Sequence, residues 1–279
     1  MTRLARTASG RAVLGDEAGF VPLSAACPGI ETMREALPLA ASGELSATGA
    51  TASRIQPTHL EFNSPLARPG KLWGIGLNYE EHAADLSENR PDEPASFMQP
   101  ASSVVGPGGP IRLPPRSQTE RVTAEAELGV VIGRTARDVS EERADSVIAG
   151  FVPVLDVTAE DILERNPRFL TRAKSFDTFL VLGPWIETGE IGLSDLDVRT
   201  VVNDEVVAEN VVSNMRFSPS ELVAFHSSVM TLEPGDLIST GTPGATTIDG
   251  GDTVRSEIDE IGTLESDVVG PSRESDARP

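Results

Sequence analysis

Cysteine and long apolar runs are scarce in this sequence. Its 279 residues include one cysteine, Cys27, which excludes an internal disulfide and disfavours a cysteine-based zinc site. No segment approaches the roughly 18 apolar residues of a membrane-spanning helix, and the N-terminus has arginines but no apolar signal core. We therefore expect a cytoplasmic protein.

Positive charge is scarce as well. The chain has 23 basic against 43 acidic residues, a formal net charge of −20. Such a surface repels nucleic acid and anionic membranes, so we expect neither as a partner. Lys71 and Lys174 are the two lysines in the sequence, and a lysine retained in this background is a candidate for a specific role.

Apolar runs separated by turn residues predict a β-rich α+β fold with a few short helices. Helices are expected at 31–45, at 140–150 after Ser140, and at 218–230 after Ser218 or Ser220. A regular βαβ alternation is absent, which argues against a doubly wound sheet. The expected strands lie within 11–23, 72–77, 94–100, 126–134, 151–158, 179–188, 196–212 and 236–244.

Turn-rich sequence near residue 68 predicts a domain boundary. We expect a small N-terminal α+β domain at 1–68 and a larger domain at 69–270. The polar residues 271–279 are expected to form a flexible tail.

Two glutamates in TAEAELGVVIG, Glu125 and Glu127, share one face of an expected strand. Asp156 is expected at the end of the strand FVPVLDVT. Three carboxylates converging from buried strands would form an oxygen-rich site for Mg²⁺, Mn²⁺ or Ca²⁺. The alternative is the solvated face of an amphipathic strand. The apolar neighbours favour burial, and buried carboxylates need partners.

A histidine and a further acid could move a proton. His82 and Asp85 are three residues apart in EEHAADL, which predicts one face of a short helix. An imidazole oriented by a carboxylate can take a proton from water, although a solvated helix would show the same spacing. Lys174, in RAKSFDTF, could pair with a carboxylate or point into a site.

Several common catalytic motifs are missing or incomplete. GIGLNY begins like a dinucleotide fingerprint, but it lacks the third glycine and a long following helix. STGTPGATTIDGGD contains no Gly-Lys-Ser/Thr, so it is not a P-loop. No G-x-S-x-G elbow is present, which disfavours serine hydrolase chemistry.

Seven segments in order resemble the fumarylacetoacetate hydrolase (FAH) superfamily. They lie between residues 70 and 265, within the 69–270 domain: GIGLNYEEHAADL, SSVVGPGGPI, EAELGVVIG, LDVTAED, AKSFDTFLVLGPW, MTLEPGDLISTGTPG and GGDTVRSEIDEIGTL. The resemblance implies a mixed β-roll or β-sandwich catalytic domain behind a small N-terminal domain, assembled as a homodimer.

The resemblance also implies a set of site residues. It places Mg²⁺ or Mn²⁺ on Glu125, Glu127 and Asp156, and catalytic roles on His82, Asp85 and Lys174. Beside these residues, we expect Gln99, Arg172 and Thr242 to bind the substrate.

This sequence departs from the family pattern at three positions. Asp85 stands where a glutamate is common, with Glu88 as a possible substitute one turn later. Gln99 replaces the lysine of F-x-K-P, and Glu160 replaces the arginine of D-V-S-A-R-D. Because two cations are lost, the sequence does not predict a dianionic substrate. Arg168 and Arg172 could instead supply positive charge to bind substrate carboxylates.

The function expected from this resemblance is metal-dependent hydrolysis of a C–C bond in an acylpyruvate-like β-diketo acid, in 2-oxo acid catabolism. The alternative function is a reaction at the same metal site in which water does not attack the substrate. The protein would then be an oxaloacetate decarboxylase or a 2-oxo acid isomerase or dehydratase. A third hypothesis is a non-catalytic protein that binds a small 2-oxo acid.

Overall fold

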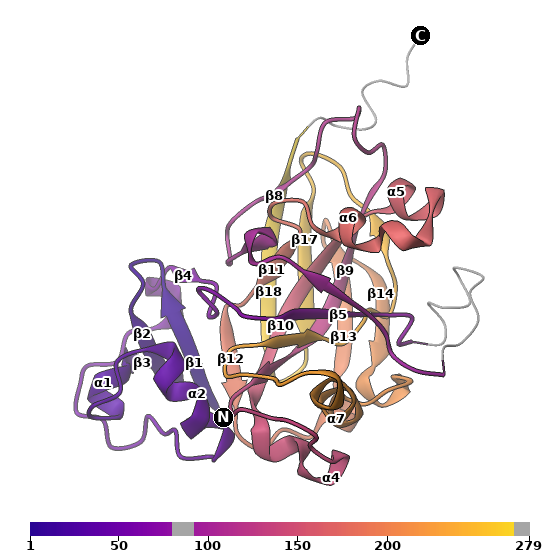
Figure 1. The fold of residues 1–279 in the computed structure, drawn as a ribbon. Helices are drawn as coiled ribbons and strands as arrows, with labels where there is room; N and C mark the ends of the chain where they lie inside the picture. The colour runs from indigo at the N-terminus through magenta and orange to yellow at the C-terminus, as the bar shows by residue number, and fades with distance from the viewer. Residues whose placement is uncertain (80–91, 271–279) are drawn as a thin grey trace.

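The computed structural model describes residues 1–79 and 92–270, and within these ranges the strands form two packed sheets (Figure 1). The larger sheet contains β1 (Thr2–Thr7), β2 (Ala12–Asp16), β3 (Gly19–Pro22), β4 (Phe62–Asn63), β5 (Leu72–Gly76), β6 (Ala95–Gln99), β7 (Val104–Val105), β9 (Val122–Ile132), β10 (Ile148–Ala159), β11 (Leu180–Leu182), β12 (Trp185–Thr188), β15 (Leu237–Ser239) and β16 (Thr246–Thr247). The smaller sheet contains β8 (Ile111–Arg112), β13 (Asp197–Val202), β14 (Glu205–Val211), β17 (Thr253–Ile258) and β18 (Gly262–Val269).

Short helices connect and cover the sheets. The α-helices are α1 (Leu23–Ala26), α2 (Met33–Ala41), α4 (Glu141–Ala144), α5 (Glu160–Arg165), α6 (Leu170–Lys174) and α7 (Pro219–Val229). The 3₁₀ turns are η1 (Pro57–His59), η2 (Ala101–Ser103), η3 (Asp145–Val147), η4 (Pro167–Phe169), η5 (Leu193–Asp195) and η6 (Val212–Asn214). None of these helices has the length and apolar character needed to span a membrane. The β-rich α+β prediction is confirmed.

The long hairpin of β9 and β10 is the centre of the fold. In the larger sheet the main strand order is β3-β2-β1-β12-β10-β9-β15-β5-β6, and the smaller sheet packs across β9 and β10. Every residue of both strands is buried because both faces of the hairpin are covered. One face carries Ala126, Leu128 and Val130 into the core shared with the smaller sheet. The opposite face carries the candidate carboxylates.

Local sequence signals explain several elements. Ser218 caps α7 in a capping box with Glu221, so Ser218 is the cap and Ser220 is not. Thr32 caps α2 in the same way. The Asn203–Asp204 turn joins β13 to β14 with both residues at positive φ, which this hairpin turn requires. The helix expected at 218–230 is confirmed with Ser218 as its cap, and the helix expected at 31–45 is present as the shorter α2.

Two local predictions were wrong. The helix expected at 140–150 stops at Ala144, and Ile148 onward belongs to β10, because apolar residues there complete a strand that is buried on both faces. Asp156 does not end its strand: β10 continues to Ala159, since the residues after Asp156 still pair with β9. Asp156 is therefore held by neighbours on both sides.

The N-terminal segment is joined to the rest of the larger sheet. β1 pairs with β12 in antiparallel register, from Thr2 opposite Thr188 to Ala5 opposite Trp185. Arg3 and the buried Glu187 add an ion pair of 3.0 Å across this junction. Figure 1 shows the indigo N-terminal elements at one side of the molecule. The domain boundaries at 68 and 270 stay predictions, and the tail at 271–279 lies outside the described residues.

Candidate metal centre and active site

Strand register brings the three candidate carboxylates together. Asp156 lies directly opposite Glu125 in the β9–β10 ladder, and Glu127 follows two residues along β9 on the same face. One carboxylate oxygen from each residue lies within 4.8 Å of the other two. The exposed fractions are 7% for Glu125, 2% for Glu127 and 0% for Asp156, which excludes the solvated-face alternative.

Neutral donors orient the carboxylates of Glu125 and Glu127. Thr158 Oγ1 donates to Glu125 Oε1 at 2.8 Å. Glu127 Oε2 accepts the Ser239 hydroxyl at 2.5 Å and the Gly241 backbone N–H at 2.9 Å. Gly241 has a φ of +96°, and a Cβ there would lie 2.8 Å from Asn78 Cβ, so a glycine is needed for this approach. Hydrogen bonds from the protein itself therefore orient the side chains of Glu125 and Glu127.

Lys174 lies between two of the carboxylates. Its Nζ donates to Asp156 Oδ2 at 2.6 Å and to Glu125 Oε2 at 2.9 Å, at the end of α6. Burial opposes the charged ammonium, but the charges of Asp156, Glu125 and Glu127 outweigh it and raise the pKa of Lys174. The lysine that is rare in this chain is therefore a charged member of the cluster.

One ammonium does not neutralise three buried carboxylates. Burial, followed by the charge of Asp156, raises the pKa of Glu127 to about 8. Burial also raises the pKa of Asp156 to about 6, although Lys174 lowers it in part. A cluster of hard oxygen donors with this excess negative charge fits a divalent cation such as Mg²⁺ or Mn²⁺. Glu125, Glu127 and Asp156 would hold the ion.

Gln99 contacts the cluster and not the cavity beside it. Its side-chain amide donates to Asp156 Oδ1 at 2.9 Å and to the Lys174 carbonyl at 3.0 Å. Gln99 is buried in β6, so this amide positions two site residues. Direct contact of Gln99 with substrate stays a prediction.

A cavity of about 740 Å³ opens onto the cluster. Glu125, Lys174 and Thr242 line it, which brings three of the predicted site residues to one space. Arg172 and Arg168 are exposed and do not line this cavity. The substrate-binding role of Arg172 stays a prediction that this placement does not support. His82, Asp85 and Glu88 lie outside the described residues.

Sequence reasoning missed Thr158, Ser239 and Gly241. Thr158 could have been found, because it lies two residues after Asp156 and so shares its strand face. Ser239 and Gly241 could not, because their contact with Glu127 depends on β15 pairing with β9 across a sequence separation of more than a hundred residues.

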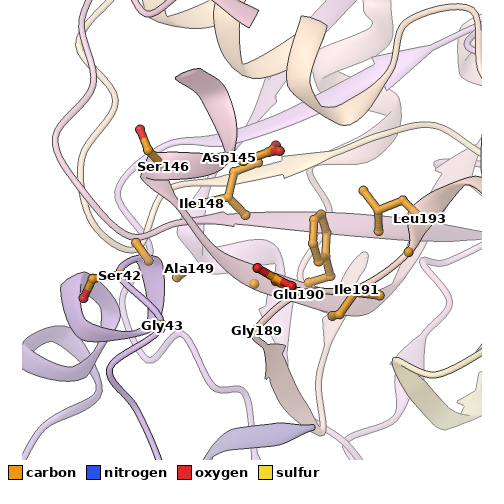
Figure 2. A pocket seen from close by; sticks show the side chains of 15 residues that line it. Ser42, Gly43, Asp145, Ser146, Ile148, Ala149, Gly189, Glu190, Ile191 and Leu193 are labelled. Atoms are coloured by element: carbon orange, nitrogen blue, oxygen red, sulfur yellow. The ribbon is translucent and has the colours of Figure 1, made fainter. Parts of the chain in front are cut away.

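A second cavity, of about 750 Å³, lies between the end of α2, the start of β10 and the 189–193 loop (Figure 2). Asp145 and Glu190 line it, and both are exposed. Most of its other lining residues are small or apolar, as Figure 2 shows for Ala149, Gly189 and Ile191. No buried charged side chain lines this cavity within the described ranges.

Comparison with known proteins defines the family. Residues 71–269 match the Fumarylacetoacetate (FAA) hydrolase C-terminal family, and the chain belongs to this family. It is 35% identical over 272 residues to a mitochondrial oxaloacetate tautomerase of Xenopus laevis, covering 92% of this chain and 84% of that one.

Two solved structures share the fold. Maleylpyruvate hydrolase from Sphingobium sp. SYK-6, in complex with manganese(II) and pyruvate, matches at a TM-score of 0.80 and 29% identity, covering 97% of this chain and 100% of that one. The 5-carboxymethyl-2-hydroxymuconate delta-isomerase from Mycobacterium smegmatis matches at a TM-score of 0.76 and 33% identity, covering 96% and 98%. The relatives are thus enzymes of more than one reaction type.

Proposed function

We propose that this protein is a divalent-metal-dependent hydrolase that cleaves a C–C bond in an acylpyruvate-like β-diketo acid. The observation that carries the proposal is the buried cluster of Glu125, Glu127 and Asp156 with Lys174, which borders a 740 Å³ cavity. The manganese and pyruvate in the Sphingobium maleylpyruvate hydrolase support it.

The chain's own residues account for binding and charge stabilisation. A bound Mg²⁺ or Mn²⁺ would supply Lewis acidity to the carbonyl of a 2-oxo acid. Lys174 provides a fixed positive charge beside the place where negative charge develops on the leaving pyruvate fragment. Thr242 lines the cavity and is proposed to contact the substrate there.

His82, oriented by Asp85, is proposed as the base that takes a proton from water. The hydroxyl of that water joins the acyl carbon, the bond between this carbon and the pyruvate methylene breaks, and the methylene takes up a proton to give pyruvate. General bases contribute roughly 10²–10⁴-fold to such steps. This role rests on the family resemblance of EEHAADL.

A direct assay tests the proposal. The Mg²⁺-loaded protein should release acetate and pyruvate from acetopyruvate, EDTA should abolish the release, and His82→Ala should lower it while Mn²⁺ binding persists. Hydrolysis that continues at the wild-type rate in His82→Ala would exclude the base role. Absence of metal-dependent turnover of any 2-oxo acid would favour the non-catalytic hypothesis.

The second candidate is a reaction of a 2-oxo acid without water, such as tautomerisation or decarboxylation of oxaloacetate. The 35% identity to the Xenopus oxaloacetate tautomerase over 92% of this chain favours it. CO₂ release or enol–keto conversion of oxaloacetate, without acetate release from acetopyruvate, would select this candidate. Either reaction should survive His82→Ala better than hydrolysis does.

A further inference from the structure

The charged groups around the active-site cavity are mostly acidic. Within the described residues, the charged side chains that line it are Glu125, Glu160, Glu164 and Lys174. Lys174 already donates to Glu125 and Asp156, so its charge is directed at the metal cluster. The part of the cavity formed by α5 therefore presents two carboxylates, Glu160 and Glu164.

The arginines near α5 do not reverse this charge. Arg121 forms an ion pair with Glu164 and is not part of the cavity lining. Arg165 pairs with Asp161 at 3.7 Å. Arg168 and Arg172 are exposed, and neither lines the cavity. Among the described residues, the outer part of the cavity thus has no lining cation.

The remaining lining is largely apolar. It comes from β5 and the residue after it, from β6, and from the α5–α6 region: Ile75, Leu77, Phe97, Leu163, Pro167 and Leu170. The amide of Gln99 points at Asp156 and the Lys174 carbonyl, so it is not available to a substrate in this arrangement. An uncharged hydrocarbon arm can bury its surface here, whereas a carboxylate would lose hydration without gaining a partner.

We propose that the site selects a monoanionic 2-oxo acid with an uncharged, apolar distal arm, and that Glu160 is the residue that excludes a second carboxylate. This inference rests on the proposed 2-oxo acid function. A divalent ion and Lys174 together would offset the three cluster carboxylates and leave the ion to accept the 2-oxo acid group. A second carboxylate further out would meet Glu160, which repels it, whereas the charge of Glu164 is offset by its ion pair with Arg121. The same argument disfavours oxaloacetate among the candidate substrates.

Binding of unreactive ligands tests this selectivity separately from catalysis. The Mn²⁺-loaded protein would be titrated calorimetrically with 5-methyl-2-oxohexanoate and with 2-oxoglutarate, which match in length and shape but differ in the distal carboxylate. We expect the monoacid to bind at least about tenfold more tightly, a ratio that one poorly screened like-charge contact can produce. Turnover of 4-methylpentanoylpyruvate and succinylpyruvate, a second matched pair, would show the same preference in kcat/KM.

Charge reversal at one position tests the role of Glu160. Glu160→Arg should reduce the monoacid-to-diacid ratio about tenfold or more, mainly by strengthening the binding of 2-oxoglutarate. Glu160→Gln, which preserves the side-chain shape, should reduce it by a smaller factor. Glu190→Arg is the matched control, because the same charge change occurs at an exposed residue of the second cavity and should leave the ratio unchanged.

The outcomes separate the two proposals. Equal or tighter binding of 2-oxoglutarate to the wild-type protein would overturn the selectivity, whether or not an acylpyruvate is cleaved. A ratio that changes equally in Glu160→Arg and Glu190→Arg would overturn the role of Glu160. Selective binding of the monoacid without cleavage of either acylpyruvate would support the selectivity and count against hydrolysis.

Discussion

Two cavities formed by the described residues, of about 740 and 750 Å³, have nearly the same volume and very different walls. The cavity beside β9 and β10 is lined by the buried Glu125 and Lys174, which are hydrogen-bonded to each other and belong to the carboxylate cluster. The cavity between α2 and the 189–193 loop has exposed acids and small or apolar neighbours (Figure 2). Volume alone therefore does not identify a reactive site. Burial of charge does, because the fold stabilises such groups only at a cost in desolvation.

The largest expected effect comes from removing one cluster carboxylate. Asp156→Asn should weaken Mn²⁺ binding by at least about 100-fold, since even the loss of an outer contact to a ligand typically costs 10–100-fold. Calorimetric titration with Mn²⁺ measures it. Asp145→Asn, in the second cavity, should leave the affinity unchanged. Equal losses of Mn²⁺ affinity in both variants would show that the cluster is not the metal site.

Substitution of Lys174 should affect metal binding and catalysis differently. Lys174→Met removes a cation that competes for Asp156 and Glu125, so Mn²⁺ affinity should be retained or increased. The turnover number should nevertheless fall by about 10²–10³, as it does when one stabilising donor is lost. Lys71→Met is the control, because Lys71 pairs with Asp236 and Glu233 away from the cavity. A Lys174→Met protein with wild-type turnover would exclude the catalytic role.

Metal affinity should depend on pH because protons compete for the same oxygens. The pKa of Glu127 is about 8 before metal binds, so below this pH a proton must leave when the ion enters. Mn²⁺ affinity should therefore fall about tenfold per pH unit below 8, more steeply below the Asp156 pKa of about 6, and level off above 8. A flat affinity between pH 6 and 8 would contradict the assigned ligands.

The smallest expected effect concerns Glu187, a buried acid that lines neither cavity. Its substitution tests whether a buried acid outside the cluster affects stability without affecting the site. Burial raises its pKa to about 7, although the ion pair with Arg3 lowers it in part. Between pH 4.5 and 7 the folded protein retains a proton that the unfolded chain has lost, so this group's contribution to stability falls as the pH rises. Relative to Glu187→Gln, the wild-type Tm should decrease by a few degrees across this window.

Metal binding and turnover of Glu187→Gln should stay at wild-type levels. A large loss of metal affinity or turnover in this variant would show that a buried acid outside the cluster also contributes to metal binding or catalysis. An unchanged difference in Tm across the window would show that Glu187 does not titrate there.

Residue patterns predicted most of the local structure and most of the cluster. The alternation in TAEAELGVVIG placed Glu125 and Glu127 on one face, and the serine cap candidates at 218 and 220 marked the start of α7. The helix at 140–150 was overestimated because an apolar run after a polar one fits a helix and a buried strand equally well. The homodimer and the roles of His82 and Asp85 stay predictions.

Sequence alone determined which side chains share a strand face, since that depends on a period of two residues. The tertiary structure alone decided that Lys174 would lie between Asp156 and Glu125, that Gln99 would bond to the cluster, and that Arg172 would lie at the surface. These contacts join segments far apart in the chain, and long-range register depends on how the whole core packs, which no local pattern records.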